Sequence, residues 1–363
     1  MSRTSSTSGP GPSIFGRLAA RSRRCAGVHS GAGGVPAATN IAISSWERGF
    51  KGGDGTMRMY RNSTDRWVAT ECIVQRRRGV GGHRASMGSN RQTCEEDLMD
   101  SQRAIFTQVA ADRFVPTYHA DIKSRWAEDH LQGGAIIGLA ALTMESRFGS
   151  PDFTPARLTV DLFKSARTIP TTARAELMRD GRRVRNSLCT IEQDGIAVAR
   201  AVLVQYRRSD PPLGDEWVSE TPVVAPPNDD DSFVQIHSTD LGWTSSISDH
   251  QNTDRKRIAV RDVDVVAGQE NTPFVQAASA VDAASLATNL GTAGLGYING
   301  DITLALVRPP RGEWIFVQAD THWATDGIAV GTATLLDGAG PFGSGLVTAL
   351  SNRSAQIDFA STS

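Results

Sequence analysis

The sequence FVQAASAVDAASLATNLGTAGLGYING, residues 274–300, decides how the rest of the chain is interpreted. Residues 274–290 are rich in Ala and Leu and contain no Pro, so they predict a helix, and the glycines that follow predict its end. Asp282 is the single ionisable residue of this helix. An apolar helix is normally buried, and burial penalises the charged form of a carboxylate. We therefore expect Asp282 to be paired, to titrate abnormally or to take part in chemistry.

The composition is that of a globular protein of ordinary charge. The chain has 363 residues with 39% hydrophobic content and a formal net charge of −1. The four cysteines show no metal-ligand spacing, which predicts a reduced, cytoplasmic protein without a bound metal. No apolar run reaches the ~18 residues that a membrane-spanning helix needs. The basic cluster at residues 76–78 has no interleaved aromatic residues, so we expect a solvated tail rather than a nucleic-acid contact.

The first part of the chain differs from the remainder in amino-acid composition and in hydrophobic periodicity. Residues 1–111 are rich in Ser, Gly and Arg and have no sustained hydrophobic period, which predicts a disordered extension. An organelle-targeting segment is one alternative, although no apolar stretch follows Arg23 and Arg24. The interpretation we favour is that the native chain begins later, at a methionine such as Met99.

The remainder contains one pattern twice. Each copy predicts an extended run, a buried helix and four strands: first over residues 112–208, with a helix beginning near Leu131 or Gly133, and again over residues 257–353. The spacing that carries Gly133 to Ser279 also carries Leu158 to Leu304. Residues 209–256 are rich in Pro and acidic residues and predict a linker, and residues 354–363 predict a tail.

This pattern predicts an α+β double hotdog, two tandem units that are each a curved antiparallel sheet wrapped around a central helix. The runs HLQGGAIIGLAALTME, TPFVQAASAVDAASLATN, GLGYINGDITLALVRPP and GEWIFVQADTHWATDGIAVG carry a closer likeness. They resemble the thioesterase-like family of double-hotdog proteins common in actinobacteria, which is related to acyl-CoA thioesterase II. The resemblance covers roughly residues 114–353.

The resemblance implies hydrolysis of an acyl-CoA thioester by an activated water. In the thioesterase II relatives an Asp of the second helix, a hydroxyl residue on the next strand and a Gln near the C-terminal end hold that water. Asp282 falls at the Asp position, Asn299 at the hydroxyl position with Thr303 further along, and the Gln position falls near Val347 or Thr348. The third member is therefore missing or replaced. The alternative for Asp282 is that it caps the first turns of its own helix.

Other residues are candidates for binding the substrate. His130, Gln132, Gly133 and Gly134 lie at the start of the first helix, where free backbone N–H groups can receive a thioester carbonyl oxygen. The alternative is that Asp129 or His130 caps this helix and the glycines only allow it to pack. Arg308 could contact the phosphates of coenzyme A, or it could be a solvated strand end.

Three functions remain open at the level of sequence. The first is an acyl-CoA thioesterase of lipid metabolism that needs no cofactor and associates through its sheets as a homo-oligomer, such as a dimer. The second is a non-catalytic protein that binds acyl-CoA or an acyl lipid. A hotdog dehydratase or hydratase is less favoured, because its paired Asp and His signature is not found.

Overall fold

The computed structural model describes residues 55–61, 67–74, 104–117, 124–218, 221–223, 225 and 232–361. The chain divides into two units, Met1–Arg84 and Ala85–Ser363. In the first, strands β1 (Gly55–Arg61) and β2 (Trp67–Val74) form an antiparallel pair. This pair lies within the segment 1–111 for which the sequence predicted disorder. The basic cluster at residues 76–78 and the possible start at Met99 lie outside the described residues.

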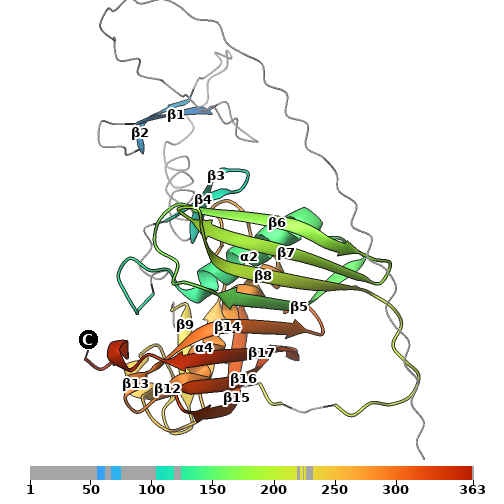
Figure 1. Ribbon diagram of the computed structural model, residues 1–363, viewed down its shortest axis with the longest axis vertical. Helices are drawn as coiled ribbons and strands as arrows, with labels where there is room; N and C mark the ends of the chain where they lie inside the picture. Colours follow the sequence, from blue (N-terminus) through green and yellow to red (C-terminus); the bar gives the residue numbers. More distant parts are fainter. Residues whose placement is uncertain are drawn as a thin grey trace, which may run out of the picture. The chain divides into compact units, whose positions relative to one another are not determined.

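The second unit is built on one antiparallel sheet, which has 13 strands within the described residues (Figure 1). Their order across the sheet is β10-β9-β11-β15-β16-β17-β14-β5-β8-β7-β6-β4-β3. The strands of the first half are β3 (Phe106–Ala110), β4 (Arg113–Pro116), β5 (Phe153–Leu162), β6 (Thr171–Asp180), β7 (Val184–Gln193) and β8 (Ile196–Arg207). Those of the second half are β9 (Val234–Ser238), β10 (Gly242–Thr244), β11 (Arg257–Arg261), β14 (Tyr297–Leu306), β15 (Trp314–Thr325), β16 (Ile328–Asp337) and β17 (Gly340–Ser351).

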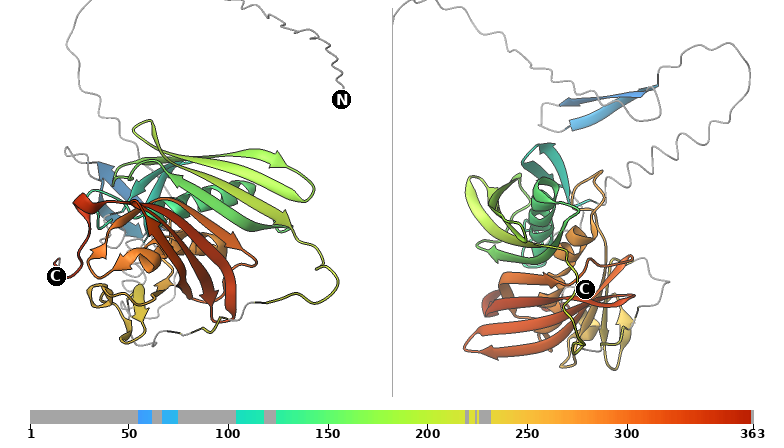
Figure 2. Two further views of the ribbon diagram at one scale, coloured as in Figure 1. Left: turned by 60° about the horizontal axis from the view of Figure 1, so that its bottom comes forward. Right: turned by 90° about the vertical axis from the view of Figure 1, so that its right-hand side faces the viewer.

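The two halves join where β14 pairs with β5. In this ladder Leu304 lies directly opposite Leu158, and Thr303 lies opposite Thr159. Leu158 and Leu304 are the positions that the sequence repeat makes equivalent. The two copies therefore meet edge to edge within one sheet, at a pair of equivalent residues. The double hotdog predicted from the repeat is confirmed: a curved sheet carries its helices on the concave side in both views of Figure 2.

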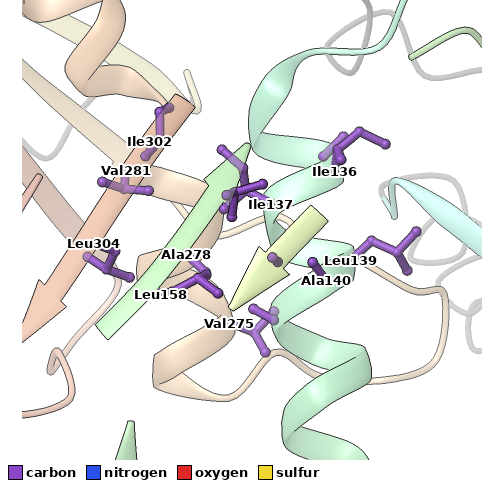
Figure 3. Close-up of a cluster of buried hydrophobic side chains, with 14 of the residues drawn as sticks. Ile136, Ile137, Leu139, Ala140, Leu158, Val275, Ala278, Val281, Ile302 and Leu304 are labelled. Carbon is purple, nitrogen blue, oxygen red and sulfur yellow. The ribbon is translucent and has the colours of Figure 1, made fainter. Parts of the chain in front are cut away.

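The helices fill the space inside the curve of the sheet. They are α2 (Gly133–Phe148), α3 (Pro273–Ala280) and α4 (Ala283–Asn289). The start of α2 at Gly133 agrees with the sequence prediction. Figure 3 shows how α2, the region of α3 and the central strands interlock, through the buried side chains of Ile136, Ile137, Leu139, Ala140, Leu158, Val275, Ala278, Val281, Ile302 and Leu304. Burial of this apolar surface is the main term that favours the fold.

The second buried helix contains one tightened turn, in which Val281 and Asp282 keep right-handed helical backbone angles. The sequence predicted one helix over residues 274–290, whereas α3 ends at Ala280 and α4 begins at Ala283. Around this turn the hydrogen bonds tighten to span three residues, with the N–H of Ala284 bonded to the oxygen of Val281 and that of Ser285 to the oxygen of Asp282. Asp282 therefore lies at the junction between two short helices.

Helices α2 and α3 approach closely because one side of α2 has glycines. A Cβ atom on Gly133 would lie 2.6 Å from Oδ1 of Asp282, and one on Gly134 would lie 2.7 Å from the backbone oxygen of Ser279. A Cβ atom on Gly138 would overlap Oγ of Ser279 and lie 2.8 Å from Cγ2 of Val265. At the opposite end of α2, Glu145 accepts a hydrogen bond from the hydroxyl of Thr272, which is the N-cap of α3. The two helices are thus held antiparallel at both ends.

Several ordered elements lie outside the predicted unit boundaries. β3 begins at Phe106, before residue 112, because Phe106 is fully buried in the core. β9 and β10 lie within the predicted linker 209–256 and extend the sheet beyond β11, so the irregular connection is shorter than predicted. The predicted tail also has structure: a 3₁₀ turn (Arg353–Ala355) is followed by a backbone bridge between Ile357 and Leu295.

The contact between α2 and α3 predicts a sensitivity to side-chain volume at Gly138. Gly138→Val should lower the free energy of unfolding by about 2 kcal/mol, because the new atoms overlap Ser279 and Val265 and force the helices apart. Gly338→Val is the matched control, since no heavy atom lies within 4 Å of a Cβ placed there. It should change the free energy by less than ~0.5 kcal/mol. Urea unfolding followed by circular dichroism compares the two; equal losses would contradict the close packing of α2.

Candidate active site

Asp282 is held by two hydrogen bonds that come from two other elements. The backbone N–H of Gly134, in the first turn of α2, donates to its Oδ2 at 2.8 Å. The side-chain amide of Asn299, on β14, donates to its Oδ1 at 3.1 Å. Each carboxylate oxygen therefore has one donor. Since a carboxylate offers about four acceptor positions, Asp282 retains the capacity to bind a further donor such as water.

The carboxylate stabilises the end of a helix other than its own. Asp282 occupies the N-cap position of α4 but makes no side-chain cap hydrogen bond there. Its partner is the N-terminus of α2, where the unpaired N–H groups and the helix dipole favour a negative charge. The alternative from the sequence, that Asp282 caps its own helix, is therefore not what the structure has. Gln132, rather than Asp129 or His130, is the N-cap residue of α2.

A β-bulge brings Asn299 to Asp282. In the ladder with β17, Asn299 lies opposite Ala349 and Asp301 lies opposite Thr348, so Gly300 is an extra residue between the two pairs. Side chains alternate between the faces of a strand, and one extra residue reverses the alternation. Without the bulge Asn299 would point to the same face as Asp301, away from the helices. With it, the amide reaches the carboxylate of Asp282.

The surroundings of Asp282 change its titration. Burial raises the pKa of the Asp282 carboxyl above its ordinary value, while the hydrogen bonds from Gly134 and Asn299 act in the opposite direction. The net direction is upward, so the group has a greater affinity for a proton than an exposed aspartate. A carboxylate with a raised pKa is a better acceptor for a proton from water.

Asp282 and Asn299 lie on the wall of a cavity of about 890 Å³. Apolar side chains from both halves of the fold form most of this wall, among them Leu131, Ile136, Leu162, Ile258, Leu286, Leu295 and Ile298. Arg125 and Lys164 also line it, and both are exposed to solvent. The volume is within the usual range for a binding site of a small organic molecule, roughly 300–1,000 Å³. The cavity thus combines an apolar interior, the carboxylates of Asp262 and Asp282, and cationic groups in contact with solvent.

Two serines lie one helical turn to either side of Asp282. Ser285 follows it, is 7% exposed and lines the cavity. Ser279 precedes it, and its hydroxyl is buried against Gly138 in the contact between α2 and α3. Ser279 also lines the cavity, but its hydroxyl faces Gly138 of α2. The sequence prediction missed Ser285, although its spacing of three residues from Asp282 would have placed it on the same side of a helix.

Thr303 and Thr348, the other predicted catalytic residues, lie away from Asp282. Thr303 is beyond the bulge, on the face of the sheet opposite the helices, and its hydroxyl lies 3.1 Å from that of Thr159. Thr348 points to the same face, where it donates a hydrogen bond to Asp301. Of the four residues predicted to form the catalytic set, the fold brings together Asp282 and Asn299.

Some of the residues predicted to bind the substrate line the cavity, and others do not. Gln132, Gly133 and Gly134 line the cavity. The N–H of Gly134 is bonded to Asp282, so it is not open to a substrate oxygen while this bond is formed. His130 lies before them on the chain, where its Nδ1 is 3.3 Å from the carboxylate of Asp129 and its backbone bridges Arg167.

Arg308 belongs to a structural ion pair. Its two terminal nitrogens donate to the carboxylate of Asp337 at 2.6 and 2.8 Å, and Asp337 is fully buried. Burial opposes the ionisation of Asp337, but hydrogen bonds from Arg308 and from the N–H groups of Ala339 and Arg311 together lower its pKa. Arg308 is thus committed to the β16–β17 turn rather than to a coenzyme A phosphate.

The described residues offer little for metal or thiol chemistry. Among them, no three His, Cys, Asp or Glu side chains gather in the way a metal ion requires. Cys189 is buried, and burial raises the pKa of its thiol to about 12. It is therefore protonated near neutral pH and is a poor nucleophile. No helix in the described part of the chain has the length and apolar character needed to cross a membrane.

Comparison with known protein families agrees with the two-part fold. The model of the acyl-CoA thioesterase N-terminal domain matches residues 122–206, and that of the acyl-CoA thioesterase C-terminal domain matches residues 206–346. The chain belongs to the acyl-CoA thioesterase family. The boundary between the two matches falls at the end of β8, close to the end of the first predicted unit at residue 208. The family resemblance predicted from the sequence is confirmed.

Solved structures similar to this thioesterase family member share its fold. Acyl-CoA thioesterase II TesB2 from Mycobacterium marinum has a TM-score of 0.50 and 14% identity, with 70% of this chain and 97% of that chain covered. A hot dog protein of unknown function from Alicyclobacillus acidocaldarius has a TM-score of 0.51 and 14% identity, with 70% and 98% covered. At these identities the likeness shows the fold. No curated protein matches the sequence.

The pair formed by Arg308 and Asp337 predicts a loss of stability at low pH. Because the folded-state pKa of Asp337 is below its ordinary value, its contribution is present above the unfolded-state pKa and is lost as the pH falls through the folded-state pKa. Asp337→Asn should lower the free energy of unfolding at neutral pH by about 3 kcal/mol and flatten its decline below the ordinary aspartate pKa of about 4. Urea unfolding at several pH values measures this. A variant that remains as acid-sensitive as the parent protein would contradict the assignment.

Proposed function

We propose that this protein hydrolyses acyl-CoA thioesters, with Asp282 as the general base for a water molecule. The observation that carries the proposal is the carboxylate of Asp282 on the wall of an apolar cavity, oriented by Gly134 and Asn299 and carrying a raised pKa. Membership of the acyl-CoA thioesterase family supports the reaction class. The acyl group would lie in the apolar part of the cavity, with its carbonyl carbon near Asp282.

In the proposed reaction, water bound to Asp282 attacks the carbonyl carbon as its proton passes to the carboxylate. A C–O bond forms and the carbonyl oxygen becomes an oxyanion. The intermediate then collapses, the C–S bond breaks, and the thiolate of coenzyme A leaves and takes up the proton held by Asp282. The products are the free acid and coenzyme A, and no cofactor is consumed.

A bound water needs more than one partner to be a well-oriented nucleophile. Thr303 and Thr348 lie on the other face of the sheet and are not part of the proposed set. We assign this role to Ser285, whose side chain lines the cavity one turn beyond Asp282. Its hydroxyl can accept a hydrogen bond from the water while Asp282 accepts the other.

Coenzyme A carries phosphates, and cations in contact with solvent suit them. Arg125 and Lys164 are exposed residues that line the cavity. Because the guanidinium of Arg125 lies 5.4 Å from the centre of the Phe359 ring, Lys164, which belongs to no buried ion pair like that of Arg308, replaces Arg308 as the proposed phosphate contact. Cytoplasmic location, a role in lipid metabolism and assembly into a dimer remain predictions from the sequence.

The second candidate function is the binding of acyl-CoA without hydrolysis. It is favoured by one observation: two of the four residues predicted to form the water-holding set lie away from the cavity. Such a protein would retain the apolar cavity and the cations that line it. Release of the thiol is what separates the two functions.

Replacement of Asp282 tests the proposed base. Asp282→Asn should reduce kcat for acyl-CoA hydrolysis by at least about a hundredfold, because the amide cannot take a proton from water. In the parent protein the activity should fall as the pH decreases through the pKa of Asp282, since the ionised form is the active one, and burial places this pKa above the ordinary value for aspartate. Thiol release, detected with a chromogenic disulfide, measures both effects.

Turnover by Asp282→Asn equal to that of the parent protein would remove Asp282 from the mechanism. If the parent protein binds acyl-CoA in calorimetry but releases no thiol, the binding function is the correct one. Asp337→Asn serves as a control, because it removes a carboxylate far from the cavity wall and should alter stability more than kcat.

The two serines beside Asp282 form a matched pair for testing the third partner of the water. Ser285→Ala should lower kcat about tenfold with little change in KM, because it removes a hydrogen bond to the water and leaves the apolar wall intact. Ser279→Ala removes the same hydroxyl from the other side of Asp282, where it faces Gly138, and should leave kcat within about twofold. Steady-state kinetics on purified variants decides between them. Equal effects would exclude a special role for Ser285.

A further inference from the structure

The chain segment beyond β17 closes one side of the cavity. Ile357 and Phe359 both line it, although they lie after the second hotdog unit predicted at residues 257–353. Phe359 is 6% exposed and packs in an apolar cluster with Leu290 and Leu295. This closing segment, residues 356–360, lies beside the β12–β13 hairpin (β12, Leu290–Gly291; β13, Gly294–Leu295; Figure 1).

Backbone hydrogen bonds fix the closing segment to this hairpin. The N–H of Leu295 donates to the oxygen of Ile357 at 2.9 Å, and the N–H of Ile357 donates back to Leu295 at 3.0 Å. The contact is so close that a Cβ atom on Gly294 would overlap the backbone oxygen of Ile357, and Gly294 has a φ of +87°. A glycine is required at this position for the chain to pass.

A second attachment comes from the connection between the two halves. The side chain of Gln251 donates to the carboxylate of Asp358 at 2.9 Å and accepts from the N–H of Phe359 at 2.8 Å. The guanidinium of Arg125 also contacts the closing segment, since it lies 5.4 Å from the centre of the Phe359 ring. The closing segment is therefore held from three directions, and the position of the Phe359 ring is defined.

Asp282 and Phe359 line the same cavity, and Leu286 contacts the apolar cluster that contains Phe359. Leu286 follows Asp282 by four residues, about 6 Å along a helix axis, and it packs on the cluster that contains Phe359. Trp126, Ile247, Leu286, Leu295, Ile357 and Phe359 all belong to both the cluster and the cavity wall. A chain whose carbonyl carbon is at Asp282 can extend along Leu286 and stop against these side chains.

We propose that Phe359, held by Gln251 and by the β12–β13 hairpin, sets the upper limit on the size of the acyl group that the cavity accepts. The proposal rests on the proposed function, because it assumes an acyl substrate with its carbonyl carbon at Asp282. A wall contributed by the closing segment differs from one built into the sheet, since a substitution there changes the room in the cavity without disturbing a strand ladder.

The test measures kcat/KM for a series of straight-chain acyl-CoAs from short to long with Phe359→Ala and with the milder Phe359→Leu. The ratio of the longest to the shortest substrate should rise at least about tenfold in Phe359→Ala and less in Phe359→Leu. Phe316→Leu and Phe316→Ala are the matched controls. The exposed fraction of Phe316, 5%, is similar to the 6% of Phe359. Phe316 belongs to a different apolar cluster and does not line the cavity.

Ratios that stay within about twofold of the parent protein in both Phe359 variants would overturn the proposal, and so would equal shifts in the Phe316 variants. If Phe359→Ala fails to fold, as circular dichroism would show, the Phe359→Leu ratios decide. If the parent protein releases no thiol, hydrolysis is excluded while the size limit is still testable. Dissociation constants for the same acyl-CoA series then replace kcat/KM, with the same expected shift and the same overturning result.

Discussion

The hydrogen bond from the N–H of Gly134 to the carboxylate of Asp282 connects the two repeats at the point where chemistry is possible. It requires that α2 approach α3 closely, which the glycines of α2 allow, and its acceptor lies at the tightened turn between α3 and α4. A helix N-terminus favours the anion, whereas burial disfavours it, and burial is the stronger effect because the pKa is raised. The carboxylate is thus held in place without losing its affinity for a proton.

The sheet contributes the second constraint. One bulge at Gly300 reverses the alternation of β14, so Asn299 faces the helices while Thr303 faces outward. The rest of the strand needs no such irregularity, since Ile302 and Leu304 are buried in the core and Leu304 meets Leu158 across the joint. The bulge at Gly300 brings Asn299 to Asp282, and the regular pairing of β14 with β5 stabilises the contact between the two halves.

Much of the fold could be predicted from the sequence because it depends on periodicity and repetition. The start of α2, the strands β5 to β8 and the equivalence of Leu158 and Leu304 follow from local pattern and from one spacing. Asp282 stood out because a single charge in an apolar helix is costly. These features depend on few residues each, and the residues are close in sequence or related by duplication.

The remaining features depend on partners that are distant in sequence. The position of the Asp282 carboxylate depends on a hydrogen bond from Gly134, the role of Arg308 on its pairing with Asp337, and the order of the closing segment on Gln251. The orientation of Asn299 depends on one inserted residue in a strand, which sequence alternation does not reveal. The predicted catalytic pair of Asp282 and Asn299 met in space, while Thr303 and Thr348 did not join it.

The spacing that makes Leu158 equivalent to Leu304 also shows which residues of the first repeat correspond to Asp282 and Asn299. The same spacing places Ile136 where Asp282 stands and Phe153 where Asn299 stands, so the first repeat carries two apolar side chains in place of the polar pair. The first repeat therefore has no counterpart of the pair formed by Asp282 and Asn299. The proposed function therefore predicts one reactive centre per molecule, and the first repeat contributes to its wall instead, since Ile136 lines the same cavity as Asp282.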